Sequence, residues 1–162
     1  KRFLPGLFIT DFPRIKQLAR HLAVGLVTRL AKDCKVLGFG SEHYAWMPDV
    51  IKEYPFIQYL HLLDAQGILQ GFAVIPEYQQ NYDKMPLGYD FSGRQWFIET
   101  MKTGALHVTD VYQSHFTDKL IITVSTVITD DNDDISGVVA WDIQLEELLQ
   151  RAELLDQEKE EE

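Results

Sequence analysis

The feature that most restricts the fold lies in the C-terminal half, where apolar, β-branched runs alternate with turns. Residues 120–128 are rich in Ile, Val and Thr, and residues 137–143 resume this character after the acidic stretch 130–134. A third run, residues 105–112, comes before them, and residues 114–119 form the connection. β-Branched residues between turn signals are typical of strands. The sequence therefore predicts three consecutive antiparallel strands, a β-meander.

A further strand pair is expected before this meander. Residues 56–63 and 68–75 are apolar runs separated by a turn at residues 64–67, a pattern typical of a β-hairpin. Residues 76–93 show little apolar periodicity. They predict a long loop, which in a compact domain is usually functional or mobile.

A short helix is expected after this loop, over residues 94–103. Asp90 or Ser92 has the side chain needed to cap its N-terminus. Gly104 follows the last apolar position and is expected to end the helix.

Longer helices are expected near both ends of the chain. Residues 11–38 carry apolar side chains at helical spacing on one broad face. These side chains are Ile15, Leu18, Ala19, Leu22, Ala23, Leu26, Val27 and Leu30. A shorter helix is expected within residues 41–54 and an exit helix at residues 145–155. The face of the first helix is wide enough for its own domain and a second chain, so dimerisation and simple core burial both stay open.

These elements predict a single α+β domain over residues 1–155, because helices and strands segregate along the chain and no linker divides it. The domain comprises the long helix (11–38), a core with a mostly antiparallel five-stranded sheet (55–144) and the exit helix (145–155). Residues 156–162 are expected to form an acidic tail. The 162 residues suffice for one domain with a sizeable core.

Composition excludes several classes of protein. The net charge of −10 argues against nucleic-acid binding, which needs clustered Lys and Arg. Cys34 is the only cysteine, so neither an internal disulfide nor a thiolate metal cluster is expected. No apolar run approaches the roughly 18–20 residues of a membrane span. The chain reads as a piece of a longer protein, and we expect membrane segments to flank it outside this sequence.

Motifs of catalysis and metal binding are missing from the sequence. It contains no GxxxxGK[ST], GxGxxG, HExxH or CxxC pattern. The acidic stretch resembles a calcium loop, but Ile135 stands where Gly is needed and Trp141 where a bidentate Glu is needed. A β-turn is expected there instead. The five histidines lack the spacing of a metal pair, and we expect no enzyme activity, no metal and no cofactor.

A group of potential binding residues remains between residues 89 and 97. Arg94 supplies a guanidinium, Trp96 an indole N–H and Tyr89 a phenol. Arg94 and Trp96 would lie in the first turn of the predicted helix, where free N–H groups favour negative charge. These groups predict a site for a small anion. The alternative is a solvated Arg and a core Trp at an ordinary loop-to-helix junction.

Residues 55–150 resemble the Cache (PAS-like, PDC) sensor domains of bacterial chemoreceptors, histidine kinases and cyclic-di-GMP enzymes. The order of elements agrees, from the long first helix to the closing Gly-Val-Val-x-x-Asp-Ile strand and its exit helix. The amino-acid-binding branch of this family has Tyr, then Arg five residues later, Trp two further and an adjacent Tyr. It also has a Tyr on the next strand and an Asp on the last. The matching residues are Tyr89, Arg94, Trp96, Tyr112 and Asp142, with Phe97 in place of the adjacent Tyr.

For one end of a ligand, this resemblance implies a carboxylate site. Arg94 can grip a carboxylate with two parallel hydrogen bonds. Trp96 and Tyr89 would add neutral donors to the same site.

For the other end, the resemblance implies an ammonium site. Asp142, the Tyr112 hydroxyl and the Phe97 ring would hold the ammonium by ion pairing, hydrogen bonding and cation–π attraction. Phe97 lacks the hydroxyl found in the family, which weakens this half. The alternative is that Arg94 and Asp142 pair directly in the core.

The resemblance implies the ligand-binding sensor domain of a bacterial transmembrane receptor, whether histidine kinase, cyclic-di-GMP enzyme or chemoreceptor. The domain would bind a small carboxylate such as an amino acid at the extracytoplasmic (periplasmic) face of the inner membrane. It would act as a homodimer through the N-terminal helix and relay the signal through its terminal helices. Two alternatives stay open: a ligand-free dimerisation or interaction module, and a small enzyme or cofactor-binding PAS-type domain.

Overall fold

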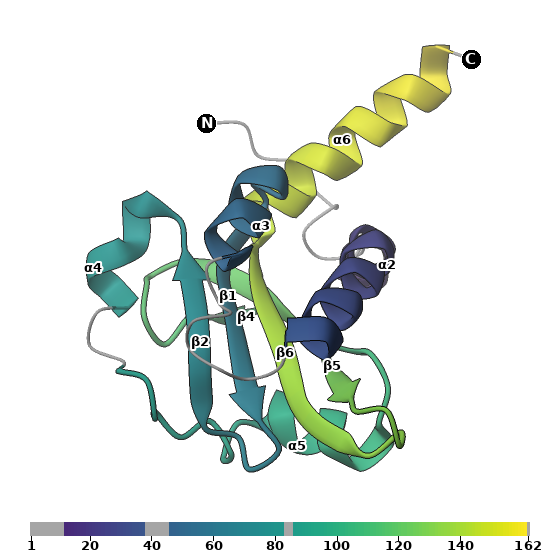
Figure 1. Ribbon diagram of the computed structural model, residues 1–162. Helices are drawn as coiled ribbons and strands as arrows, with labels where there is room; N and C mark the ends of the chain where they lie inside the picture. The colour runs from purple at the N-terminus through teal and green to yellow at the C-terminus, as the bar shows by residue number, and fades with distance from the viewer. Residues whose placement is uncertain (1–11, 38–45, 83–85, 162) are drawn as a thin grey trace.

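A central antiparallel sheet organises the protein (Figure 1). The structure, a computed structural model, describes residues 12–37, 46–82 and 86–161. Across the sheet the order is β2 (Leu69–Val74), β1 (Ile57–Asp64), β6 (Ile135–Gln144), β5 (Leu120–Thr129) and then β3 (His107–Val108), with β4 (Tyr112–Gln113) also paired to β5. The predicted α+β fold with five strand positions is confirmed, and the fifth position is filled by two short strands.

The prediction of one continuous strand over residues 105–112 is wrong. Val108 pairs with Val124 and Tyr112 pairs with Ile121, so three residues of this segment oppose two residues of β5. Inside this bulge the backbone N–H of Thr123 donates to the Thr109 hydroxyl at 2.9 Å rather than to a carbonyl. The extra residue places Tyr112 in register with Ile121, on the same face of the sheet as Thr123.

Three helices cover one face of the sheet, namely α2 (Phe12–Leu37), α3 (Met47–Glu53) and α6 (Leu145–Glu161) (Figure 1). α2 corresponds to the predicted long helix, and those predicted apolar residues whose side chains are described are buried or half-buried. They pack against alternate residues of the central strands, including Leu60, Ile122, Val124, Trp141 and Ile143. Residues 1–11 and 38–45, which include the last residue of the predicted long helix and the start of the predicted shorter one, lie outside the described residues.

On the opposite face lie α5 (Gln95–Thr103) and the segment that leads into it. The prediction of an unstructured loop over residues 76–93 is wrong in part, because η2 (Pro76–Tyr78) and α4 (Gln79–Tyr82) lie within it. Tyr78, Tyr82 and Phe91 are buried in an aromatic cluster on this face. Aromatic residues at irregular spacing bury this segment without the periodicity that reveals a helix or strand.

The turn between β1 and β2 touches the segment before α5. Gly67 has a φ of +87°, and a Cβ at this position would lie 2.9 Å from the backbone N and Cα of Ser92. Phe91 N–H also donates to the Gly67 carbonyl at 2.8 Å. The positive φ and the close approach to Ser92 both require a glycine at this position. The contact fixes the start of α5 against the sheet.

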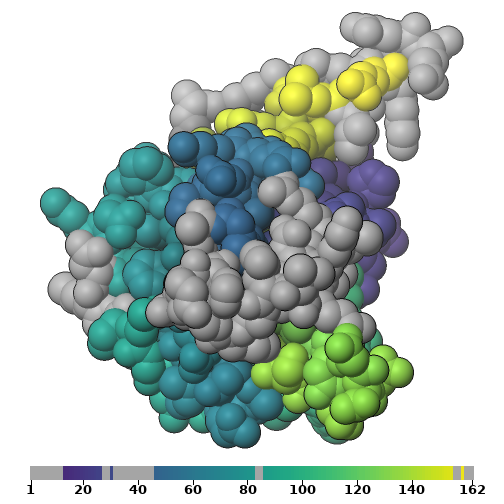
Figure 2. Space-filling view, in the orientation of Figure 1, coloured from purple at the N-terminus to yellow at the C-terminus, as the bar shows by residue number. Residues whose placement is uncertain are grey.

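The exit helix is longer than predicted. α6 continues to Glu161 through most of the stretch expected to be a tail, because Glu, Gln and Lys are good helix formers. Its yellow residues project from the rest of the molecule (Figure 2). At the other end of β6, the Asp130 carboxylate accepts the N–H groups of Asn132 and Asp134, as expected for a turn. Among the described residues, no helix has the length and apolar character to cross a membrane.

Candidate functional site

Arg94 stands at the N-terminus of α5, where it is the N-cap residue with extended backbone angles. The predicted capping by Asp90 or Ser92 is wrong, because the Asp90 carboxylate accepts the Ser92 N–H at 2.8 Å and forms a local turn instead. The Arg94 guanidinium carbon lies 5.6 Å from the centre of the Phe91 ring and 5.7 Å from that of Phe116. These two cation–π contacts hold the guanidinium in place.

Asp142 lies on β6, between Tyr59 of β1 and Thr123 of β5 in the register of the sheet. It is only 4% exposed. The Thr123 hydroxyl donates to Oδ1 of Asp142 at 2.7 Å. A hydroxyl has one proton, so Tyr112 must be the donor in its hydrogen bond to the Thr123 oxygen. The bulge described above thus places Tyr112 in a chain that ends at the carboxylate.

The charge of Asp142 depends on its surroundings. Burial raises the pKa of its carboxyl from 3.8 to about 7, against the opposing effects of the Thr123 hydrogen bond and the Arg94 charge. Near neutral pH this carboxyl is therefore close to half ionised. A cation placed beside it would favour the ionised form.

Arg94 and Asp142 line one small cavity together with Trp96 and Tyr112. The volume open to the centre of a water molecule is about 10 Å³, room for about one water. Within the described part of the chain, no hydrogen bond or ion pair joins Arg94 to Asp142. The Arg94 guanidinium and the partly ionised Asp142 carboxyl thus share a cavity without pairing.

Two larger hollows flank this cavity, and Arg94 and His115 line both of them. One, of about 430 Å³, extends along Lys16 and residues 107–112. The other, of about 460 Å³, is lined by Tyr89, Asp90, Gly93 and Phe116 as well. Arg94 therefore lies where the small cavity of about 10 Å³, called the inner cavity below, meets the two outer hollows.

The remaining two predicted site residues lie outside the inner cavity. Tyr89 lines the outer hollow of about 460 Å³ and packs its ring edge-on against Phe91 at 4.9 Å. Phe97 lines none of these three hollows. It is buried in the aromatic cluster, with its ring 6.4 Å from that of Trp96. The structure thus brings four of the six predicted residues together.

The sequence analysis missed two cavity residues on β1, Tyr59 and His61, and also Thr123. The rings of Tyr59 and His61 stack at 4.5 Å. Burial and then the Arg94 charge lower the pKa of His61 to about 3. Burial and then the Asp142 charge raise the pKa of Tyr59. Both side chains are therefore neutral. The signal in the sequence was a pair of polar rings two residues apart in a strand whose other polar residues are Gln58 and Asp64.

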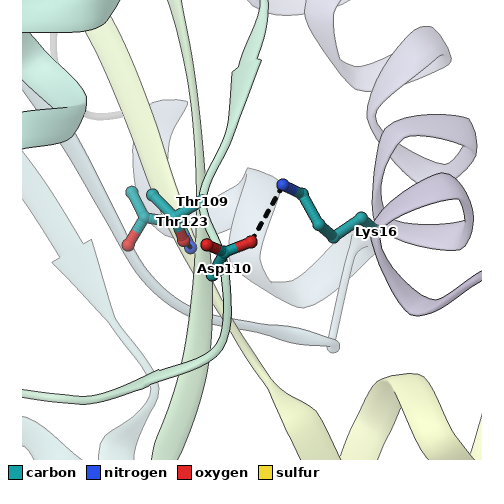
Figure 3. Close-up of polar contacts among 4 residues, drawn as sticks. All are labelled: Lys16, Thr109, Asp110 and Thr123. Atoms are coloured by element: carbon teal, nitrogen blue, oxygen red, sulfur yellow. Dashed lines mark hydrogen bonds and ion pairs between the residues drawn. The ribbon is translucent and has the colours of Figure 1, made fainter. Parts of the chain in front are cut away.

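A chain of contacts runs from the cavity wall to α2 (Figure 3). Thr123, whose hydroxyl holds Asp142, donates its N–H to the Thr109 hydroxyl. The neighbouring residue Asp110 pairs with Lys16 of α2 at 3.1 Å. The Asp110 and Lys16 side chains are 92% and 37% exposed, so this ion pair contributes little free energy by itself. It does mark where the bulge meets the helix.

An antiparallel sheet with helices on one face and a buried cavity under a short helix on the other is the architecture of PAS-like sensor domains. Residues 44–150 match the family described as "Methyl-accepting chemotaxis protein-like, first PDC sensor domain". The chain belongs to this family of chemoreceptor sensor domains. The resemblance to Cache (PDC) domains found in the sequence is confirmed.

Two curated relatives match the chain. "Citrate (Re)-synthase" of Syntrophus aciditrophicus (strain SB) is 35% identical over 158 residues, which are 96% of this chain and 25% of that protein. "Methyl-accepting chemotaxis protein McpB" of Bacillus subtilis (strain 168) is 34% identical over 98 residues, which are 59% of this chain and 14% of that protein. The chain thus spans a quarter or less of the length of these relatives.

Solved structures of chemoreceptor domains have the same fold. The ligand-binding domain of the amino-acid chemoreceptor PctC of Pseudomonas aeruginosa, in complex with GABA, matches with a TM-score of 0.61 and 25% identity, over 83% of this chain and 59% of that one. The ligand-binding domain of Tlp3 of Campylobacter jejuni, in complex with L-norvaline, matches with a TM-score of 0.64 and 20% identity, over 85% and 57%. At 20% identity the second likeness concerns the fold alone.

Proposed function

We propose that this domain binds a small carboxylate, in particular an amino acid, and passes the signal to the receptor of which it is part. The observation that carries the proposal is the shared cavity of Arg94 and Asp142, which hold opposite charges and do not pair with each other. Separated charges of this kind favour a ligand that carries both signs. An α-amino acid has a carboxylate and an ammonium a few ångströms apart.

The carboxylate end is assigned to Arg94. Its guanidinium makes no hydrogen bond or ion pair with the described residues, and it lies over the rings of Phe91 and Phe116. Its N–H groups therefore stay available for two parallel hydrogen bonds to a carboxylate. Trp96 adds an indole beside it in the inner cavity. Tyr89 lies in the outer hollow, and its hydroxyl would contact the ligand only from that side.

The ammonium end is assigned to Asp142, held by the chain from Tyr112 through Thr123. A bound ammonium would lower the pKa of this carboxyl and make it fully ionised near neutral pH. Phe97 lies away from the inner cavity, so we propose that it supports Trp96 rather than contacting the ligand. The neutral rings of Tyr59 and His61 would take the place assigned to it.

The comparison with PctC supports the same class of ligand, because GABA also carries a carboxylate and an ammonium. The citrate in the name of the Syntrophus relative is a carboxylate without an ammonium. We assign no catalysis to this domain, since the chain corresponds to a quarter of that protein and belongs to a sensor family.

Signal transfer is assigned to the helices on the face of the sheet opposite the cavity, which include α2 and α6. The cavity has room for about one water, so entry of an amino acid would move α5 and the segment before it. Thr123 would pass this movement through the bulge to α2. Shifts of about 1–2 Å at a helix interface suffice to switch a receptor. We propose a homodimer through α2, where Val24 is 60% exposed, and an extracytoplasmic location.

A thermal-shift screen followed by calorimetry tests the proposal. The panel holds the proteinogenic amino acids, GABA, citrate and short organic acids. A true ligand at a hundred times its Kd should stabilise the fold by about 2.7 kcal/mol. Arg94→Ala should abolish this effect. Arg151→Ala is the matched control, because Arg151 also lies over an aromatic ring, 5.1 Å from the centre of Phe56, but on the far face of the sheet.

Each result discriminates between functions. An amino acid that binds the wild type and the Arg151 variant but not the Arg94 variant supports the proposed site. Binding that survives Arg94→Ala would overturn the site. A panel without any ligand would favour a module for dimerisation or protein interaction, to be followed by sedimentation. A visible absorbance band of the purified protein would point to a bound cofactor instead.

A further inference from the structure

Tyr59 and His61 form a side of the cavity whose rings lie at the ammonium end, while their polar atoms are used by neither end of the amino acid. They lie two residues apart on the cavity face of β1, and Tyr59 is in register with Asp142 on β6. The exposed fractions of the two residues are 1% and 2%. The His61 ring also packs edge-on against Trp96, at 5.2 Å. The pair thus occupies the cavity wall between Asp142 and Trp96.

Both side chains carry a buried polar atom without a partner. The Tyr59 hydroxyl and Nδ1 of His61 make no hydrogen bond with any described residue. A buried polar group left unpaired costs about 1–3 kcal/mol. The fold has no need of polarity at this face of β1, because Leu63, the next residue on it, is fully buried and apolar. Both residues line the cavity, so a ligand bound there would lie beside these unpaired atoms.

We infer that Tyr59 and His61 contact the ligand and select an amino acid whose short side chain carries a hydroxyl or an amide. This inference rests on the proposed function and names the ligand class within it. A neutral phenol and a neutral imidazole each offer a hydrogen-bond donor and acceptor. They therefore match a neutral polar side chain. A charged side chain would stay unpaired against them, and an aliphatic one would leave both atoms unsatisfied.

The size of the cavity favours a short side chain. Arg94 and Asp142 already claim the two ends of the amino acid, and the rings of Phe91, Trp96 and Phe116 close the space around them. A hydroxyl or amide one or two carbons beyond Cα is the polar group that fits without displacing this aromatic wall. L-Serine, L-threonine and L-asparagine have such side chains.

The test compares ligands of equal shape on the full chain by calorimetry. L-Threonine and L-valine differ in one hydroxyl in place of a methyl group. Threonine should bind about tenfold or more tightly, since valine leaves buried polar atoms unpaired. L-Serine should exceed L-alanine in the same way. Tyr59→Phe and His61→Phe should each bring the threonine-to-valine ratio toward one.

The stability of the free protein separates this role from a structural one. Tyr59→Phe removes a hydroxyl that has no partner among the described residues, so its Tm should stay or rise. Tyr82→Phe is the control. The Tyr82 hydroxyl accepts a 2.8 Å hydrogen bond from Gln58 and lines none of the three hollows. This variant should lose stability and keep the ligand preference.

The outcomes divide cleanly. A threonine preference that falls in the Tyr59 or His61 variants supports the inference. The inference is overturned if valine binds as tightly as threonine or more tightly, or if the threonine preference survives in both variants. In that case the proposed function still stands, provided that amino-acid binding depends on Arg94. If no amino acid binds the wild type, the proposed function fails and the inference fails with it.

Discussion

Replacing Asp142 by Asn should change how the stability of the free protein depends on pH. In the folded protein, burial raises the pKa of this carboxyl from 3.8 to about 7. The folded state therefore holds a proton that the unfolded state has already released. Between about pH 4 and pH 7 the unfolding free energy falls as the pH rises, because ionisation is easier in the unfolded chain. Asn cannot ionise, and its side-chain carbonyl can still accept the Thr123 hydroxyl.

The magnitude follows from the interval between the two pKa values. Each pH unit in this interval costs about 1.4 kcal/mol, so the full effect is about 4 kcal/mol at pH 8. Between pH 5 and pH 8 the wild type should lose about 2–3 kcal/mol relative to Asp142→Asn. His61 acts in the opposite direction, because its lowered pKa makes the wild type lose stability below about pH 6.5. The difference between the two proteins cancels the His61 contribution.

The assay is urea unfolding of both proteins at pH 5, 6, 7 and 8 without ligand. The unfolding free energy of Asp142→Asn minus that of the wild type should increase steadily over this range. Asp110→Asn is the control, since the Asp110 side chain is 92% exposed and its ion pair with Lys16 is weak. Parallel pH curves for the wild type and Asp142→Asn would refute the reasoning, because the carboxyl would then have an ordinary pKa.

Three more predictions concern the same region. Thr123→Val removes a hydrogen bond that lowers the pKa of Asp142. In urea unfolding, the pH range over which ionisation of Asp142 lowers the unfolding free energy should therefore extend to higher pH. Binding of an amino acid should release a proton and weaken about tenfold for each pH unit below about 7, whereas calorimetry in buffers of different ionisation heat should find no such release for acetate. Gly67→Ala combines a φ of +87° with a Cβ 2.9 Å from the Ser92 backbone and should cost about 2–3 kcal/mol in urea unfolding. Gly88→Ala has a φ of +94° but no atom within 4 Å of the new Cβ, so it should cost about 1 kcal/mol.

The fold class could be predicted because its main elements obey simple periodicities. The spacing of Ile15, Leu26 and Leu30 marks the buried face of α2, and the β-branched runs mark β5 and β6. The division of residues 105–112 could not be predicted, because a side chain, that of Thr109, takes a hydrogen bond that a carbonyl usually accepts. The strand propensities of the residues do not indicate that a side-chain hydroxyl replaces a backbone carbonyl as the hydrogen-bond acceptor.

For the candidate site, four of the predicted residues line the cavity, namely Arg94, Trp96, Tyr112 and Asp142. The sequence analysis did not name Tyr59 and His61, which line it as well. Arg94 stands out in the sequence because it lies beside Trp96 at a predicted helix start, and Asp142 is identified through the resemblance to Cache domains. Tyr59 and His61 do not stand out, because buried aromatic rings usually serve packing. Their polarity becomes informative only when the structure places both residues in the lining of a cavity and leaves a polar atom of each without a partner among the described residues. Phe97 lies in the aromatic cluster and not in the cavity lining, which the sequence pattern alone does not reveal.

The position of the bulge explains how a ligand site on one face of the sheet can affect helices on the other. Side chains alternate between the faces of a strand, so a regular edge strand would separate the two sides. Here the extra residue in segment 109–111 lets Tyr112 face the cavity and join Thr123, while Asp110 reaches Lys16 on α2 (Figure 3). A change in the charge of Asp142 alters the hydrogen bond that Thr123 donates. Because Thr123 also holds the bulge through its backbone, we propose that the segment that touches α2 responds to the same change.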